Sequence, residues 1–408
     1  MPSPMSPAGV LRSGVRRLLG VTVALALSAL SAYGVAEPAQ ADASVSPRSG
    51  SFAVRGAGWG HGWGMSQYGA YGAARKGLSW QEILAFYYTG TTVEKHTAST
   101  KLRVWITADS DGDLRVEPAA GLRVTDAAGH SVTLPTGAKY DGWRLTRSGS
   151  DLKLSYQTGS GSWVDYPISL EGDPWAFHTS AKIVRVVMPG GTVRPYRGYV
   201  SLVRRGTGAR TVNTVTVESY VKGVVPAEMP TSWDADAVRA QAVAARSYAL
   251  RLASFGWYDG ADLCDTTSCQ VYRGVSAETL AGDDAVLATA GKVVMYDGKI
   301  AYTQFASSNG GSSANGDFPY LKAKDDPYDD VVTSHNWSQS VSASSIRRAW
   351  PSVGAVHKLK ITDRDGHGRW GGRVTKIKIY GSKGSVTVSG ATFQSRFGLK
   401  SRLFTAAR

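Results

Sequence analysis

One stretch, residues 212–252, constrains the fold more than any other because its hydrophobic period changes in the middle. From Val212 apolar and polar residues alternate, which is typical of a half-buried strand, and the breakers at residues 223–226 end that run. A helical pattern follows from Ser232, a good N-cap. The sequence therefore predicts a strand, a turn and a helix, with Glu228 in the turn just before the helix.

The predicted helix carries two polar side chains on one face. At about 100° per residue, Gln241 and Tyr248 share an azimuth lined by small residues, whereas Arg246 lies away from it. A carboxylate at the junction before this helix, such as Glu228, is held by rigid elements and partly desolvated, which raises its pKa toward that of a general acid. The alternative is an ordinary charge at a helix entry.

Several short motifs occur in a fixed order along the chain. They are GVVPAEMP, SW and AVRAQAVAARSYAL within the central stretch, Tyr196-Arg197-Gly198 before it, and CQVYRG, SSNGG, PYLKAKDDPYD and GLKSRLF after it. This set resembles the sporulation stage II protein D (SpoIID/LytB) domain, whose characterised members are peptidoglycan lytic transglycosylases. The family name alone implies no role in sporulation.

The resemblance implies a role for individual residues. Glu228 matches the family's essential acid. Glycan-positioning residues are expected at Gln241, Arg246, Tyr248, Ser307 and Ser308, although Arg246, off the Gln241 face, has packing as an alternative role. The expected reaction cleaves the bond between N-acetylmuramic acid and N-acetylglucosamine and leaves a 1,6-anhydro end.

Two competing functions stay open. A glycosidase would need a second carboxylate at a defined distance, and the only candidates, Asp325, Asp326 and Asp329, are interpreted as turn and surface charges. A non-catalytic wall-binding module that stimulates a peptidoglycan amidase would also fit the basic, aromatic-rich chain.

A glycine-rich segment, residues 52–95, contains GHGWGMSQYGA followed by helical patterns at 65–76 and 80–88. The same pattern occurs in the SpoIID family, usually near the end of the domain, so we expect the segment to fold back onto the catalytic region. His61, Gln67 and Tyr68 are predicted to face the substrate. For His61, a metal ligand, a second acid–base group and a hydrogen-bonded core residue are the alternatives.

Residues 1–41 have the features of a signal peptide. Basic residues precede an apolar run at 18–30, and Ala39-Gln40-Ala41 supplies a cleavage site. The expected location is outside the cytoplasmic membrane, in contact with the cell wall and its glycan strands. An uncleaved N-terminal anchor is the alternative.

The remaining chain predicts an α+β fold: an antiparallel β-rich domain at 99–211, a mixed catalytic core at 212–345 built around one helix, and a β segment at 346–408. Short β-type runs in the first of these lie at 101–107, 114–118, 122–125, 131–134, 143–146, 152–156 and 183–187. A helix at 283–290, a hairpin at 292–305 and strands at 359–363, 374–380 and 385–389 complete the prediction.

Charge is concentrated at the C-terminal end. The chain carries +14, and residues 346–408 hold fourteen Lys and Arg against two acids, which gives 14 − 2 = +12. Such a segment favours a polyanion, here an anionic wall polymer, since no nucleic-acid-binding motif is present. The alternative is a solvated basic surface.

The two cysteines, Cys264 and Cys269, are expected to form a disulfide in an exported protein. Some SpoIID members bind zinc here with a histidine before the second cysteine. This chain has Ser268 instead, and two thiolates alone make a poor zinc site. We therefore expect no metal and no cofactor.

Overall fold

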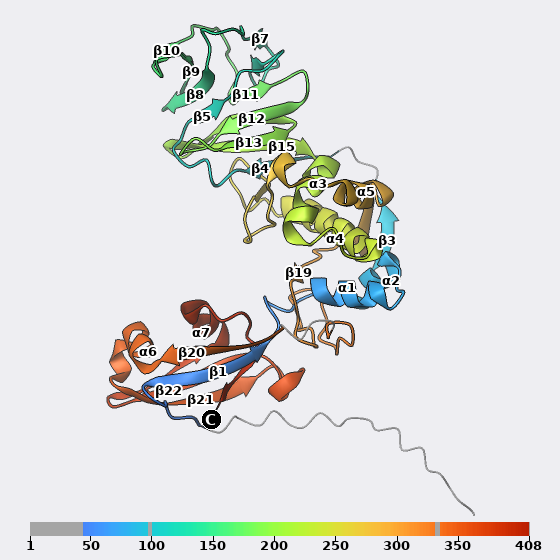
Figure 1. The fold of residues 1–408 in the computed structure, drawn as a ribbon, viewed down its shortest axis with the longest axis vertical. Coiled ribbons are helices and arrows are strands. Elements are labelled where there is room, and N and C mark those ends of the chain that lie inside the picture. The colour runs from blue at the N-terminus through green and yellow to red at the C-terminus, as the bar shows by residue number, and fades with distance from the viewer. Residues whose placement is uncertain (1–43, 97–99, 331–334, 408) are drawn as a thin grey trace, which may run out of the picture. The chain divides into compact units, whose positions relative to one another are not determined.

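A computed structural model describes residues 44–96, 100–330 and 335–407. The predicted signal peptide, residues 1–41, lies outside the described residues. The predicted α+β class is confirmed, because helices pack against largely antiparallel sheets (Figure 1). No helix within the described ranges is both long and apolar enough to cross a membrane.

The β-rich region is built from two sheets that share one hydrophobic core. The six-stranded sheet has the order β10 (Trp163–Asp165), β9 (Asp151–Gln157), β8 (Gly142–Ser148), β5 (Leu114–Val116), β12 (Ile183–Val187), β13 (Val193–Arg197). The seven-stranded sheet has the order β16 (Leu263–Cys264), β4 (Lys101–Trp105), β15 (Gly208–Thr216), β14 (Tyr199–Arg205), β11 (Trp175–His178), β6 (Arg123–Thr125), β7 (Ser131–Thr133). Every β-type run predicted here coincides with a strand. Strands β10, β11, β13 and β14 were not predicted.

The central stretch differs from its prediction. Strand β15 ends at Thr216, which caps helix α3 (Val217–Glu228) by accepting the Ser219 amide, so Glu228 lies in the last turn of a helix. Residues 223–226 do not form the predicted turn but continue helix α3. Gly223 is needed within this helix, because a Cβ there would lie 2.7 Å from the Tyr272 ring.

The second helix of the stretch, α4 (Ala235–Ala253), begins at Asp234 rather than at the predicted cap Ser232. Most of its side chains are buried. Its neighbours are α3, α1 (Gln67–Arg75), α2 (Trp80–Tyr87), α5 (Leu280–Ala288) and a small sheet of β18 (Lys299–Ile300), β17 (Lys292–Tyr296) and β3 (Thr92–Lys95). Helix α4 is thus the element on which the mixed region is assembled.

The C-terminal region has a separate core that includes the first strand of the described chain. β1 (Ser51–Ala57) pairs on one side with β20 (Asn336–Ser342) and on the other with β24 (Phe404–Ala407). A second sheet contains β21 (Val356–Arg364), β22 (Val374–Gly381) and β23 (Gly384–Ser389), and helices α6 (Ala343–Ala349) and α7 (Gly390–Phe397) pack in the same region. The predicted 52–95 segment is therefore divided between this core and α4.

Candidate functional site

A cavity of about 600 Å³ lies where α3 ends and the glycine-rich segment begins. Its walls come from five separate segments of the chain. The lining residues are Trp59, Gly60, His61, Gln67, Glu228, Tyr248, Thr267, Ser268, Cys269, Tyr302, Gln304, Phe305, Ala306 and Ser307. Among these described residues Glu228 is the only acid, so proton donation by a carboxyl group in this cavity depends on it.

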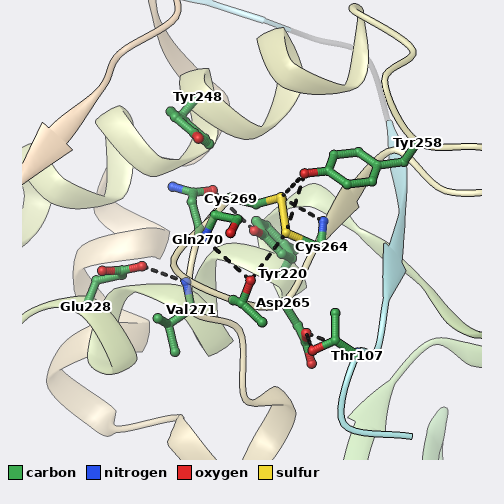
Figure 2. The surroundings of a disulfide bond; sticks show 12 residues. Thr107, Tyr220, Glu228, Tyr248, Tyr258, Cys264, Asp265, Cys269, Gln270 and Val271 are labelled. Carbon is green, nitrogen blue, oxygen red and sulfur yellow. Dashed lines mark hydrogen bonds between the residues drawn. A yellow bond between two sulfur atoms is a disulfide. The ribbon is translucent and has the colours of Figure 1, made fainter. Parts of the chain in front are cut away.

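Glu228 is anchored through one oxygen only. The Val271 amide donates a hydrogen bond of 2.6 Å to its Oε1, as Figure 2 shows beside the disulfide. Oε2 has no hydrogen-bond or ion-pair partner within the described part of the chain. Burial raises the pKa of Glu228 and outweighs the opposing effect of the Val271 amide. The residue is therefore a fixed carboxyl group that holds its proton to a higher pH than an exposed glutamate.

His61 lines the same cavity as a neutral imidazole. Burial, with a contribution from the Arg373 charge, lowers its pKa to about 4. Its Nδ1 accepts a 2.9 Å hydrogen bond from the Trp63 amide, and the two rings stack. This neutral ring can hydrogen-bond a ligand but does not supply a positive charge near pH 7.

The glycine-rich segment does fold back onto the catalytic region, as predicted. Gln67 Nε2 lies 3.1 Å from the backbone oxygen of Glu228 and 3.4 Å from Gln241 Oε1. Gln241 is completely buried, and its Nε2 has no hydrogen-bond partner among the described residues. Gln67 thus faces the cavity, whereas Gln241 lies behind it and orients its amide.

Two tyrosines form one wall of the cavity. The Tyr302 hydroxyl donates to the Tyr248 hydroxyl at 2.9 Å, and the rings stack with centroids 4.6 Å apart. Burial raises the pKa of both phenols, so they remain neutral donors and acceptors. Tyr302, Gln304 and Trp59 were not predicted as site residues, although Trp59 lies in the same glycine-rich segment as His61, just before the GHGWGMSQYGA motif.

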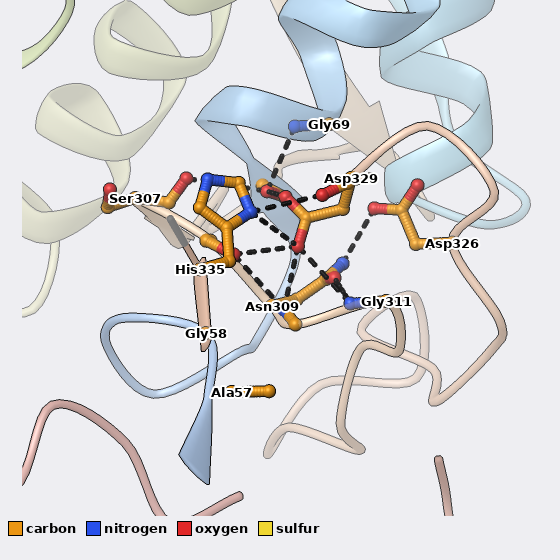
Figure 3. Close-up of polar contacts among 12 residues, drawn as sticks. Ala57, Gly58, Gly69, Ser307, Asn309, Gly311, Asp326, Asp329 and His335 are labelled. Carbon is orange, nitrogen blue, oxygen red and sulfur yellow. Dashed lines mark hydrogen bonds and ion pairs between the residues drawn. The ribbon is translucent and has the colours of Figure 1, made fainter. Parts of the chain in front are cut away.

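Of the two serines predicted to bind glycan, only Ser307 lines the cavity. The prediction for Ser308 is corrected, because its hydroxyl is buried and donates to Asp329 Oδ2 at 2.7 Å. Figure 3 shows the Asp329 carboxylate among its polar contacts. Asp329 also accepts the Ser66 hydroxyl at 2.6 Å and the Gly310 amide at 2.7 Å. Ser308 therefore fixes the loop and does not line the cavity.

The buried carboxylates also correct the prediction of surface charges. Asp326 accepts hydrogen bonds from Tyr87 and Asn309, each 2.7 Å long, and like Asp329 it is 3% exposed. Both acids bind α1, α2 and the 307–311 loop together. Neither lines the cavity, so neither is the second carboxylate of a hydrolase at this site.

Arg246 and Tyr68 also lie outside the cavity lining, contrary to prediction. The Arg246 guanidinium is buried and binds both carboxylate oxygens of Glu218, at 2.9 and 2.7 Å. Tyr68 packs its ring against Trp233 and His335. Arg246 therefore has the packing role that was the alternative for it, because it lies off the Gln241 face of the helix.

Beneath the glycine loop lies the side chain of Arg373, which is 1% exposed. Its Nη2 donates to the carbonyls of Asn309, at 2.9 Å, and Ser312, at 2.7 Å. Gly62 has φ +79°, and a Cβ there would lie 2.1 Å from Nη2. Arg373 thus ties the 307–312 loop and the His61 loop to the C-terminal region.

The structure joins Cys264 and Cys269 in the expected disulfide, with Cα atoms 5.6 Å apart. Cys269 and Ser268 form part of the cavity wall. Because both sulfurs are bonded to each other, they do not provide the thiolates that zinc requires. The disulfide instead holds the loop whose Val271 amide anchors Glu228.

The fold and the site define an α+β protein with one glutamate in an otherwise neutral cavity. Residues 205–296, which include that glutamate, match the family model described as Stage II sporulation protein, SpoIID. The resemblance to the SpoIID family is therefore confirmed for this part of the chain.

Similar proteins include the "Amidase enhancer" of Bacillus subtilis (strain 168), 36% identical over 132 residues, which are 31% of this chain and 17% of that protein. The "Stage II sporulation protein D" of the same strain is 29% identical over 170 residues, 36% of this chain and 50% of that protein. Its counterpart in Bacillus amyloliquefaciens is 32% identical over 144 residues, 30% of this chain and 42% of that protein. The aligned parts thus span at most half the length of these relatives. A role related to the cell wall follows from this family relationship.

Proposed function

We propose that this protein is an exported peptidoglycan lytic transglycosylase that uses Glu228 as its only acid–base group. The observation that carries the proposal is Glu228 itself: a carboxyl group with a raised pKa, one anchored oxygen and one free oxygen, in a cavity with no other acid among its described lining residues.

The reaction requires one proton donor and no water. Protonated Glu228 gives its proton to the glycosidic oxygen as the bond to the muramyl C1 breaks. The muramyl 6-hydroxyl oxygen then attacks C1, and its proton returns to the Glu228 carboxylate. The products are a free N-acetylglucosamine hydroxyl and a 1,6-anhydromuramyl end, and the glutamate is regenerated.

The rest of the cavity suits an uncharged sugar. Neutral His61, the Gln67 amide and the paired hydroxyls of Tyr248 and Tyr302 offer hydrogen bonds without a charge. Trp59, 57% exposed at the same cavity, offers a flat apolar ring on which a sugar can stack. A hydrolase with paired carboxylates finds no second acid here.

The test is mass analysis of purified glycan strands, with and without stem peptides, after incubation with the mature protein or with Glu228→Gln. Glutamine keeps an oxygen for the Val271 amide but cannot donate the proton. Glu171→Gln, the same change at an exposed glutamate of the β-rich region, is the matched control.

We expect 1,6-anhydro ends from the wild type and from Glu171→Gln, and none from Glu228→Gln. Products that have gained water would identify a glycosidase. Anhydro products from Glu228→Gln would assign the acid to another residue.

The second candidate is a wall-binding module that stimulates an amidase, and the similarity to a protein named "Amidase enhancer" favours it. Release of stem peptides by a purified peptidoglycan amidase, measured with and without Glu228→Gln, separates the two. If Glu228→Gln still stimulates the amidase and the wild type gives no anhydro product, the wall-binding module would replace the enzyme as the proposed function.

A further inference from the structure

The outer face of the β21–β22–β23 sheet is rich in lysine. On β21 and β22 the apolar residues that point inward are buried: Leu359, Ile361, Ile377 and Ile379. The alternate positions point outward, and we call five of them the lysine face: Lys358, Lys360, Lys376, Lys378 and Tyr380. The sheet thus separates an apolar core from a basic surface.

The strand register places like charges side by side on this face. Lys360 lies directly opposite Lys378, an arrangement that costs stability in the absence of a counter-charge. Asp363, opposite Lys376, approaches it at 3.7 Å, and both side chains are largely exposed. Lys358, Lys360 and Lys378 have no ion-pair partner in the described part of the chain.

Tyr380 holds two of these lysines in place. Lys358 Nζ lies 4.1 Å and Lys378 Nζ 5.2 Å from the centroid of its ring. Hydroxyl residues of β23 continue the face, since Ser385 lies opposite Tyr380 and Thr387 opposite Lys378. The ammonium donors of β21 and β22 and the hydroxyl donors of β23 therefore lie side by side at strand spacing, roughly 4.8 Å across the strands and 6.7 Å along them.

The choice of lysine indicates the kind of anion. An ammonium group is a point charge that binds phosphate from many directions, whereas the fork of arginine, which matches carboxylate and phosphate alike, fixes the geometry of its partner. A row of such charges suits a flexible polymer with one negative charge in each repeat. We propose that the lysine face binds a phosphodiester-linked anionic polymer of the cell wall, separately from the Glu228 cavity.

Two other anionic partners fit less well. The exposed large apolar side chains of the described chain, Trp59, Val164, Trp257, Leu280 and Leu287, all lie elsewhere, so nothing on this face would insert into a bilayer. Single-stranded nucleic acid needs open aromatic rings for stacking, whereas the one ring here, Tyr380, is approached by two ammonium groups.

The test measures binding of the full mature protein to poly(glycerol phosphate) over a range of salt concentrations. The variant Lys360→Gln with Lys378→Gln is compared with Lys153→Gln with Lys299→Gln, which removes the same charge from exposed positions on other strands. Circular dichroism checks the fold of both. Vesicles with anionic lipid and single-stranded DNA serve as competing probes.

We expect the face variant to bind the polymer about 30-fold more weakly, at roughly 1 kcal/mol for each of the two lysines, with a shallower salt dependence. The control variant should bind within about 2-fold of the wild type. Equal binding by wild type and face variant would overturn the proposal, and so would a stronger preference for the vesicles or the DNA. Production of anhydro ends from soluble glycan is independent of this face, so its outcome tests the enzyme proposal alone.

Discussion

The guanidinium of Arg373 occupies the space that a side chain on Gly62 would need, with Nη2 2.1 Å from the ideal Cβ position. Arg373 of the C-terminal region and Gly62 of the GHGWGMSQYGA motif therefore pack together beneath the candidate site. Glycine is therefore required at position 62 for two reasons, the close contact with Arg373 and the backbone angle φ of +79°.

Gly62→Ala should destabilise the protein by more than the left-handed backbone alone explains. That conformation costs about 1–2 kcal/mol for a non-glycine residue, and displacing Arg373 would weaken its bonds to the 309 and 312 carbonyls. Gly190→Ala, with φ +88° and open space around the Cβ, measures the backbone cost by itself. Urea unfolding that gives equal losses for both would contradict the packing of Arg373 against Gly62.

The pH dependence of glycan cleavage should have a descending alkaline limb set by Glu228. Its pKa is raised by burial, and the general acid works only while protonated, so kcat/KM should fall as the pH rises through a midpoint above the usual value of about 4.3. His61, whose pKa is lowered to about 4, is already neutral in this range. His61→Asn should leave the midpoint in place, and a shifted limb would assign it to the imidazole.

Asp109 should make stability depend on pH. It is buried, accepts the Thr211 hydroxyl at 2.6 Å, and burial raises its pKa to about 7. The folded state thus keeps a proton that the unfolded chain loses above about pH 4, so the free energy of unfolding should fall between pH 4 and 7, by on the order of 3 kcal/mol. Asp109→Asn should flatten this fall in urea titrations, whereas Asp151→Asn, at an exposed site, should reproduce the wild-type slope.

Arg246→Met should lower stability without weakening glycan binding. It leaves Glu218 without its guanidinium partner, at a cost of about 2–4 kcal/mol, less than for a fully buried pair because Glu218 reaches solvent. Arg239→Met, on the same helix, breaks a surface pair with Asp236 and should cost about 0.5 kcal/mol or less. A raised KM for Arg246→Met at a temperature where it is folded would restore its predicted role at the substrate.

Trp59→Ala should raise KM about 5-fold with little change in melting temperature. The ring lines the cavity, is 57% exposed and has Lys400 Nζ 4.5 Å from its centroid, so its loss removes a stacking surface and little core. Trp257→Ala is the control, since this ring is 63% exposed, stacks on Phe255 and does not line the cavity. Equal KM values for the two variants would argue against a sugar on Trp59.

The sequence predicted elements well where their signal is local. Alternating apolar residues located β4 and β12 to within two residues, and Ser79 with Glu82 forms a full capping box at the start of α2. Helix α3 was missed because Gly223 and Pro226 are local breakers. Packing of Gly223 against Tyr272, a contact across 49 positions, overrides that propensity.

At the candidate site, the motifs predicted several residues that line the cavity, but they did not predict which residues contact one another. Glu228, His61, Gln67, Tyr248 and Ser307 do line one cavity. Ser308 and Arg246 belong to the same motifs, but each is turned away by a partner elsewhere in the chain, Asp329 and Glu218. A single sequence contains no signal that pairs these residues.

The position of β1 between β20 and β24 has a consequence for the order of folding. Ala53 to Gly56 pair with the residues from Phe404 onward. The backbone hydrogen bonds on this edge of β1, the strand that leads into the His61 loop, therefore form only after almost the whole chain has been synthesised. Such distant pairing is slow to form. A chain that appears from its N-terminus first can therefore complete helix α4 before the strand that leads into the His61 loop has both of its neighbouring strands.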